Sequence, residues 1–345
     1  MTINGANFTV TADTLCNDGS VEKYFTGGAP SGWSVGALRA AGTIAGTGFG
    51  TKSTTSYYDD FEARETGATG GSIGDLVVSN SGGSSISTAV AHSGSKALSQ
   101  DYSSESFPKI YKSLSGSSRH VYMSCWLRWS GSVAGSTVWK FGRVGAGAAY
   151  SGVPRAGESY VSSGVPRPGG FGGEMVSSNG ITGYGANADT LAADGSLYAE
   201  DTWQFYELEF DAGTADGSDS YFIVRVNNTV ALEWDGKEYL TAANSQLPDW
   251  VLLPINGLDN APSIIMTIDE LYIDESRARV IMTDNATYSI STKYSAQPVT
   301  AWSDTSISYT QKRGEIGIGE TAYLHVFNNS GALVHTTPGF TVEAD

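Results

Sequence analysis

The sequence predicts an all-β protein. Glycine accounts for 43 of the 345 residues and only 16% of residues are charged, against about 25% in an average globular protein. Short segments of alternating apolar and polar residues recur along the chain, separated by turns rich in Gly, Ser, Asn and Asp. This pattern is typical of antiparallel strands joined by hairpins. The length allows one large β domain with a smaller one, or two to three domains.

The chain is acidic, with a formal net charge of −16. Such a balance repels nucleic-acid phosphates and anionic membrane surfaces, so we expect no nucleic-acid and no membrane partner. Residues 1–15 (MTINGANFTVTADTL) carry neither the basic nor the apolar region of a signal peptide. That start is expected of a virion component, which is made in the cytoplasm and released by lysis. A secreted protein whose signal was removed is the alternative.

Three regions are expected. Residues 1–56 hold weak strands at Asn7–Thr11 and Val21–Phe25 and a Gly/Ala/Thr-rich run, which together predict an N-terminal attachment arm and linker. Residues 57–277 form the large β domain. Residues 278–345 supply about five to seven short strands at regular spacing, which suggests a small immunoglobulin-like sandwich.

Within the large domain, alternation and turn residues predict a series of short strands. They are Tyr57–Arg64, Gly70–Ser81, Ala89–Tyr102 (a hairpin turning at His92–Ser95), Phe107–Leu114, Val121–Trp129, Thr137–Phe141, Gly173–Ser178, Tyr198–Phe210, Ser220–Asn227, Thr229–Trp234 and Ser263–Asp274. A long Gly/Pro-rich loop is expected after Arg143, because Pro154, Pro166 and Pro168 exclude a helix and an interior strand. The loop contains SGVPR twice and is interpreted as a ligand-contacting lid, a subunit contact or a plain insertion.

The segment from Arg119 to Arg143 is the strongest candidate for a binding face. Val121, Met123, Cys125, Leu127 and Trp129 alternate with Tyr122, Ser124, Trp126 and Arg128, which predicts a strand with one apolar face and one face carrying aromatics and a cation. Aromatic rings beside fixed donors suit a sugar ring. The predicted glycan-binding residues are Tyr122, Trp126, Arg128, Trp139, Lys140, Arg143, Arg155 and Arg167. The alternative is that these aromatics pack under a neighbouring loop or against another subunit.

Four motifs now combine into a resemblance. DDFE at 59–62, HSGSKAL at 92–98, IDELYID at 268–274 and the strand VYMSCWLRW resemble the concanavalin A-like, carbohydrate-binding jelly-roll superfamily over residues 57–275. WLRW, WKFGR and GGFGGEM are similar to segments of alginate and glucuronan lyases. The resemblance implies a jelly-roll β-sandwich. The C-terminal region resembles the small immunoglobulin-like (TIG-like) modules that space, dock or bind.

The same resemblance implies a structural calcium ion where the first and last strands of the jelly roll meet. Carried over to this chain, the implied ligands are Glu62 and Asp269, with backbone carbonyls near Ser93–Lys96. Carboxylate and carbonyl oxygens are the ligands that Ca²⁺ prefers. The alternative is that Glu62 and Asp269 only cap turns.

No complete catalytic set is evident, so no catalytic residue is predicted. A glycosidase needs two facing carboxylates. Glu207 and Glu209 share a strand face but lack the third acid of the E-x-D-x-x-E pattern. A lyase needs a Tyr or His base and a cation for the uronate carboxylate; Tyr122, His120, Arg128, Lys140 and Arg143 offer parts of such a set only.

The sequence therefore predicts a virion structural or adhesion protein, such as a spike, tail fibre or capsid-decorating protein. It would combine an N-terminal arm, a lectin-like jelly roll that binds surface glycans or neighbouring subunits, and an immunoglobulin-like module, as a homo-oligomer on the virion surface. The alternative is an extracellular polysaccharide lyase that cleaves a uronate polysaccharide by β-elimination, or a secreted carbohydrate-binding protein.

Overall fold

A computed structural model describes most of the chain from residue 41 onward. The described residues are 23–25, 35–36, 41–52, 56–67, 72–73, 75–80, 83–101, 109–131, 138–145, 155–162, 170–177, 180–184, 190–191, 200–237, 239–240, 247–253 and 264–343. Apart from one turn of 3₁₀ helix at Tyr288–Ile290, the regular elements among them are strands, so the all-β prediction is confirmed. In the described residues no helix has the length and apolarity needed to cross a membrane.

The chain forms two compact units. The larger is Tyr57–Glu275, and the predicted domain 57–277 stays a prediction. The smaller combines Met1–Ser56 with Ser276–Asp345.

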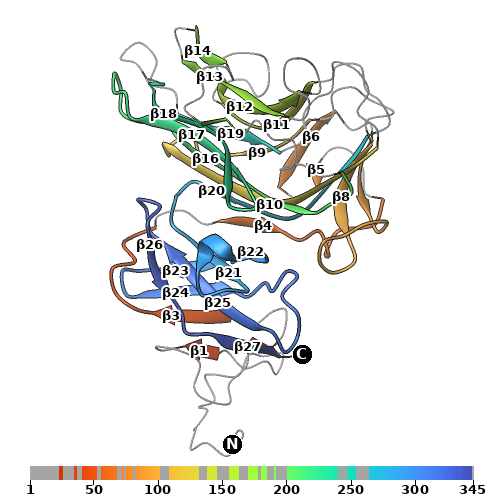
Figure 1. Cartoon of the computed structure of the whole chain (residues 1–345), viewed down its shortest axis with the longest axis vertical. Coiled ribbons are helices and arrows are strands. Elements are labelled where there is room, and N and C mark those ends of the chain that lie inside the picture. The colour runs from red at the N-terminus through yellow and green to blue at the C-terminus, as the bar shows by residue number, and fades with distance from the viewer. Residues whose placement is uncertain are drawn as a thin grey trace, which may run out of the picture. The chain divides into compact units, whose positions relative to one another are not determined.

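The larger unit is a sandwich of two antiparallel sheets, as predicted for a jelly roll (Figure 1). The first, called here the β10 sheet, has nine strands in the order β15–β18–β17–β16–β10–β20–β8–β7, with β4 paired to β20. Its strands are β4 (Tyr57–Asp59), β7 (Ser84–Ser87), β8 (Ala97–Asp101), β10 (His120–Ser130), β15 (Thr190–Leu191), β16 (Gln204–Asp211), β17 (Ser220–Val226), β18 (Thr229–Lys237) and β20 (Ile265–Asp274).

The second sheet, called here the β11 sheet, has eight strands in the order β14–β13–β12–β11–β19–β9–β6–β5. These are β5 (Ser72–Ile73), β6 (Leu76–Asn80), β9 (Lys109–Ser113), β11 (Val138–Gly145), β12 (Arg155–Ser162), β13 (Gly170–Ser177), β14 (Gly180–Tyr184) and β19 (Trp250–Leu252). Figure 1 shows the two sheets as separate layers.

The apolar core of the larger unit lies between these sheets. Val121, Met123, Cys125 and Leu127 of β10 join it from one sheet, and Val144 of β11 joins it from the other. Each is at most 1% exposed, and burying a side chain of this size contributes roughly 1.5–3 kcal/mol. The period-two alternation that predicted β10 therefore places its apolar residues in the core.

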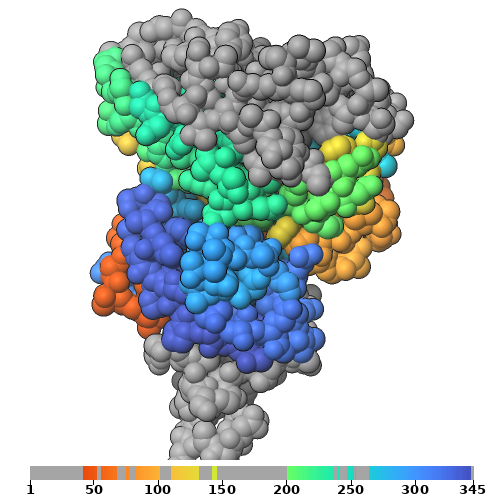
Figure 2. Space-filling model, in the orientation of Figure 1, coloured from red at the N-terminus to blue at the C-terminus, as the bar shows by residue number. Residues whose placement is uncertain are grey.

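The hairpin between β17 and β18 follows the expected turn chemistry. Asn227 and Asn228 both have positive φ, at 48° and 61°. A two-residue turn with two positive φ values is type I′, whose twist matches that of the flanking strands. In the space-filling view, the green part of the surface belongs to residues from 200 onward, which include this hairpin (Figure 2).

The smaller unit has its own core between a four-stranded and a six-stranded sheet. The first contains β1 (Lys23–Phe25), β3 (Ala41–Ala45), β24 (Ser306–Thr310) and β23 (Val299–Trp302); the second contains β2 (Val35–Gly36), β27 (Phe340–Glu343), β25 (Thr321–Phe327), β21 (Arg279–Thr283), β22 (Tyr294–Ala296) and β26 (Leu333–Thr336). The immunoglobulin-like label for this unit stays a prediction.

The described strands of residues 1–56 pair with one another and with strands of residues 278–345, and the predicted arm and linker stays a prediction. β3 pairs antiparallel with β24, and Ile44 lies in the core beside Ile307. β2 pairs parallel with β27. The low apolar content hid these strands, because small residues such as those of AGTIA pair through their backbone while contributing little alternation. The expected strand Asn7–Thr11 lies outside the described residues.

Two other strand predictions were wrong. The region expected to be a continuous Gly/Pro loop contains β12 and the start of β13. Pro154, Pro166 and Pro168 lie outside these strands, and a proline constrains only its own position and the residue before it. The strand that pairs with β8 is β7 at Ser84–Ser87, before the expected Ala89.

Candidate functional site

The segment predicted as one contact face divides between the two sheets. β10 pairs with β16 and β20, whereas β11 pairs with β12 and β19. Tyr122, Trp126 and Arg128 therefore lie on a different sheet from Trp139, Lys140 and Arg143. The expectation of a shared face was wrong because alternation assigns residues to the faces of one strand, and cannot say that the next strand crosses to the other sheet.

The polar face of the β10 sheet is a buried network of tyrosines and carboxylates. Tyr122 is fully buried and its hydroxyl donates to Glu207 Oε1 at 2.7 Å. Glu209 Oε1 accepts from the Tyr221 hydroxyl at 3.0 Å, and its Oε2 accepts from the Arg225 guanidinium at 3.1 Å. Both glutamates are 1% exposed. The strand face that Glu207 and Glu209 share, as the sequence predicted, is therefore a buried polar layer.

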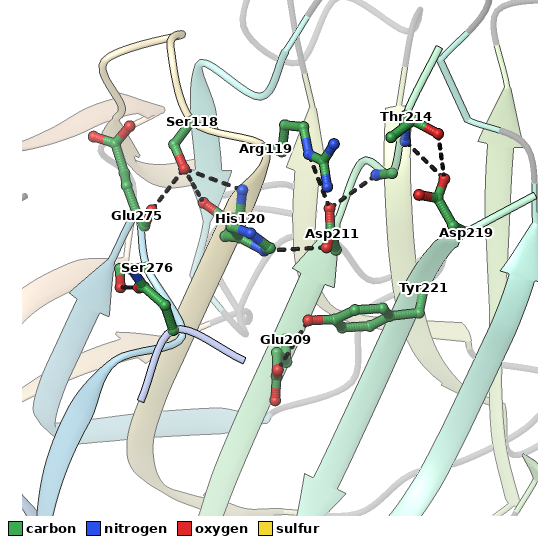
Figure 3. Close-up of polar contacts among 12 residues, drawn as sticks. Ser118, Arg119, His120, Glu209, Asp211, Thr214, Asp219, Tyr221, Glu275 and Ser276 are labelled. Atoms are coloured by element: carbon green, nitrogen blue, oxygen red, sulfur yellow. Dashed lines mark hydrogen bonds and ion pairs between the residues drawn. The ribbon is translucent and has the colours of Figure 1, made fainter. Parts of the chain in front are cut away.

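This layer becomes partly exposed at one end, beside the start of β10 (Figure 3). Asp211 Oδ2 lies 3.3 Å from His120 Nδ1, and its Oδ1 lies 3.7 Å from Arg119 Nε. Oδ1 also accepts the Gly213 N–H at 2.8 Å. The side chains of Arg119 and His120 are 40% and 28% exposed. The sequence indicated His120 as a candidate but not Asp211. The two residues come together only through the register of β10 with β16, which places Asp211 opposite His120.

Trp126 packs under a turn, as the alternative interpretation held. Its ring stacks on His92 at 3.8 Å and 17°, and it is 4% exposed. His92 Nδ1 lies 2.9 Å from Glu270 Oε1. Arg128 forms an ion pair with Asp201 at 2.7 Å, with side chains 19% and 57% exposed. Glycan contact by Tyr122, Trp126 and Arg128 stays a prediction, and the burial of the two rings favours a packing role.

The two implied calcium ligands bind backbone N–H groups. Glu62 Oε1 accepts from Ser95 and Lys96. Asp269 Oδ2 accepts from His92 and Ser93, and its Oδ1 from Glu270. Burial, and then the charge of Glu270, raises the pKa of Asp269 to about 8.

This donor set fits turn capping rather than calcium, because each N–H occupies a lone pair that the ion would need. Where the structure describes side chains, His, Cys, Asp and Glu form no group of three or more suited to a metal. The geometry of the described residues therefore does not support the calcium ion that the sequence resemblance implies at Glu62 and Asp269.

β11 carries the cations of the second sheet around a β-bulge. Gly142 has φ +51°, and a Cβ there would lie 2.7 Å from Leu208 Cδ1 and from the Tyr206 hydroxyl. The glycine therefore backs onto the core, as does Val144, while Arg143 between them belongs to the opposite face. Arg143 is 7% exposed.

The bulge also sets the register with β12. Lys140 is opposite Tyr160, and after the shift at Gly142 Arg143 is opposite Glu158. Glu158 and Tyr160 are two residues apart, so their positions share one face of β12. Without the bulge, Lys140 and Arg143 would alternate to opposite faces, because they are three residues apart. This row, defined as Lys140, Arg143, Glu158 and Tyr160, is called here the β11–β12 row.

The remaining predicted residues fall nearby or outside the described part. Trp139 is opposite Val161, and Arg155 is opposite Gly145, at the far end of β12. Arg167 lies outside the described residues. Sequence reasoning found Lys140 and Arg143 but missed Glu158 and Tyr160, because it treated their segment as loop.

No protein-family profile and no curated protein sequence matches the chain. Among solved structures, it is similar to the PL-14 alginate lyase from Aplysia kurodai (12% identity, 64% of this chain and 99% of that chain, TM-score 0.44). It is also similar to alginate lyase Aly36B (13%, 64% and 96%, TM-score 0.44) and to endo-β-1,4-glucuronan lyase from the fungus Trichoderma reesei (12%, 64% and 95%, TM-score 0.41). Identities this low and TM-scores under 0.5 say nothing of what this chain does.

Proposed function

We propose that the larger unit is a polysaccharide-binding domain and that the β11–β12 row contacts the glycan. The observation that carries the proposal is the bulge at Gly142, which brings Lys140 and Arg143 to one face of β11. Cations are scarce in this chain, with 20 Lys and Arg against 36 Asp and Glu. Lys140 and Arg143 are two of these 20 cations, and Arg143 is 7% exposed.

The row combines the groups that a sugar requires. Lys140 and Arg143 are donors, Glu158 is an acceptor, and Tyr160 offers a ring and a hydroxyl. A pyranose presents hydroxyls in the plane of its ring and C–H groups above it, so donors and acceptors beside an aromatic residue match both kinds of surface. A strand pair holds these positions rigidly, which lowers the entropic cost of binding.

A direct test is binding of the whole protein to alginate, a glucuronan and a neutral glucan by isothermal titration calorimetry. Lys140→Ala removes a charged donor worth about 1.5–3 kcal/mol, which corresponds to a Kd roughly 10- to 100-fold weaker. Lys293→Ala is the matched control, because Lys293 belongs to the smaller unit and pairs with Glu320. Equal affinities for Lys140→Ala and Lys293→Ala, or no binding to any glycan, would contradict the proposal.

A second candidate is β-elimination of a uronate polysaccharide, and the placement of Tyr160 opposite Lys140 favours it. Elimination needs a base for the proton beside the uronate carboxylate and a cation that stabilises the developing charge. Tyr160 and Lys140 are residues of those types. The unsaturated product is followed by its ultraviolet absorbance. Activity that Tyr160→Phe abolishes while binding persists would identify a lyase, and binding without product would identify a binding protein.

We also propose, from the sequence, the virion role: a homo-oligomeric spike, fibre or capsid-decorating protein that attaches at a virion surface. The acidic Gly/Ser/Thr-rich β composition supports it. Light scattering of the purified protein measures the oligomeric state, and antibody labelling of virions or of culture supernatant separates the virion from the extracellular alternative. A monomer found only free in the supernatant would refute the virion role.

A further inference from the structure

Two turns of the larger unit are held together by the Glu62 carboxylate. One follows β4 and the other precedes β8. Oε1 of Glu62 accepts the N–H groups of Ser95 and Lys96, both at 2.7 Å, and Oε2 accepts the Ser95 hydroxyl at 2.9 Å. Gly94, with φ +65°, lies so close to this carboxylate that a Cβ would collide with it. We call this contact of residues 59–64 with 92–96 the turn junction.

The ammonium group of Lys96 closes the same junction. It donates to the carbonyl oxygen of Glu62 at 2.9 Å and to that of Arg64 at 2.7 Å. The side chain is partly buried. Backbone carbonyl oxygens are ligands that a hard cation such as Ca²⁺ prefers. A lysine ammonium is a compact point charge with three donors, so these carbonyls already face a cation that belongs to the chain.

The carboxylates around the junction are arranged for N–H donors and not for a second cation. Asp269 Oδ2 accepts the N–H groups of His92 at 2.9 Å and Ser93 at 3.1 Å, and Oδ1 accepts that of Glu270 at 2.8 Å. Glu62 Oε1 likewise carries two N–H bonds. An added divalent ion would have to displace these donors and lie near the positive ammonium group, at an electrostatic cost.

We propose that Lys96 is the structural cation of the turn junction and takes the place of a divalent metal ion, so that the larger unit is stable without calcium. The calcium ion implied by the sequence resemblance would bind at the same turns, through Glu62, Asp269 and carbonyls near Ser93–Lys96. This inference is independent of glycan binding at the β11–β12 row, since the two groups of residues do not overlap.

The experiment is thermal unfolding of the whole protein in EDTA and in millimolar CaCl₂, for the wild type and for Lys96→Met. Methionine keeps most of the length of the side chain and removes its charge and donors. We expect the wild-type Tm to agree within about 1 °C in the two buffers, and Lys96→Met to lower it by about 4 °C or more, since two charge-assisted hydrogen bonds are lost.

Lys112→Met is the matched control. Lys112 lies in the same unit and its side chain is 21% exposed, but its ammonium group is 3.8 Å from Asp75, which is 75% exposed, and 5.0 Å from the Tyr57 ring. An ion pair with so exposed a partner contributes little. A Tm decrease of less than about 2 °C is expected for it. The proposal is overturned if calcium raises the wild-type Tm by more than about 3 °C, or if Lys96→Met is no less stable than Lys112→Met. If Lys96→Met fails to fold, the effect of calcium on the Tm of the wild type still tests the proposal.

Discussion

The bulge at Gly142 gives the most direct test of how β11 presents its cations, through the substitution Gly142→Ala. The residue has φ +51°, where an L-residue with a Cβ is strained by about 1–2 kcal/mol. The added methyl group would also lie 2.7 Å from Leu208 Cδ1 and 3.4 Å from Met123 Cε. Forcing one more carbon into a packed core costs about 1–3 kcal/mol. The expected loss of unfolding free energy is therefore about 2–5 kcal/mol.

Gly67→Ala separates the two contributions. Gly67 lies in the same unit and has φ +77°, but nothing lies within 4 Å of a Cβ built on it. It should lose only the backbone part, about 1–2 kcal/mol. Urea unfolding followed by tryptophan fluorescence measures both variants, and glycan binding is measured at low temperature where both remain folded. Gly142→Ala should weaken binding and Gly67→Ala should not.

Equal stability of the two variants would refute the core contact assigned to Gly142. Full glycan affinity in a folded but destabilised Gly142→Ala protein would show instead that the bulge does not govern the β11–β12 row.

Three further predictions concern the two units. Tyr122→Phe removes a buried donor to the Glu207 carboxylate and should lower the unfolding free energy by about 1.5–3 kcal/mol. A double-mutant cycle with Glu207→Gln should show coupling between the two residues. Additive losses of stability would show that this hydrogen bond does not contribute. Arg128→Ala should change stability by less than about 1 kcal/mol, because its partner Asp201 is 57% exposed; a larger loss by urea unfolding would contradict this. His325 is buried between Thr283 and Thr336, and burial lowers its pKa below the ordinary 6.5. The unfolded chain then takes up the proton first, so the stability of the smaller unit should fall as pH drops below about 6.5. Burial lowers the pKa of His335 in the same unit as well, so His325→Gln should reduce this pH dependence, and an unchanged pH profile would refute the assignment.

Much of the fold could be predicted because it depends on local pattern. The alternation in Val121–Trp129 predicted β10, and its inward residues lie in the core. The Asn227–Asn228 turn predicted the β17–β18 hairpin from turn chemistry alone. β3 was missed because its small residues carry little alternation, and β12 because the prolines near it were given more weight than Tyr160 and Val161.

The candidate site was less predictable because its members come from distant parts of the chain. Lys140 and Arg143 were identified by residue type, but their partners on β12 depend on register across a bulge. Glu62 and Asp269 were identified by motif, and the capping N–H groups that bind them come from the turn at His92–Lys96.

The sequence by itself determined the all-β class and which residues of β10 and β16 face the core, because these follow from composition and the period-two geometry of a strand. The tertiary structure alone decided that β10 and β11 belong to different sheets, that Tyr122 and Trp126 are buried, and that Gly142 brings Lys140 and Arg143 to one face. The physical reason is that strand pairing and register arise from contacts between residues far apart in the chain. Local alternation constrains the face of a residue but not its neighbour on the next strand.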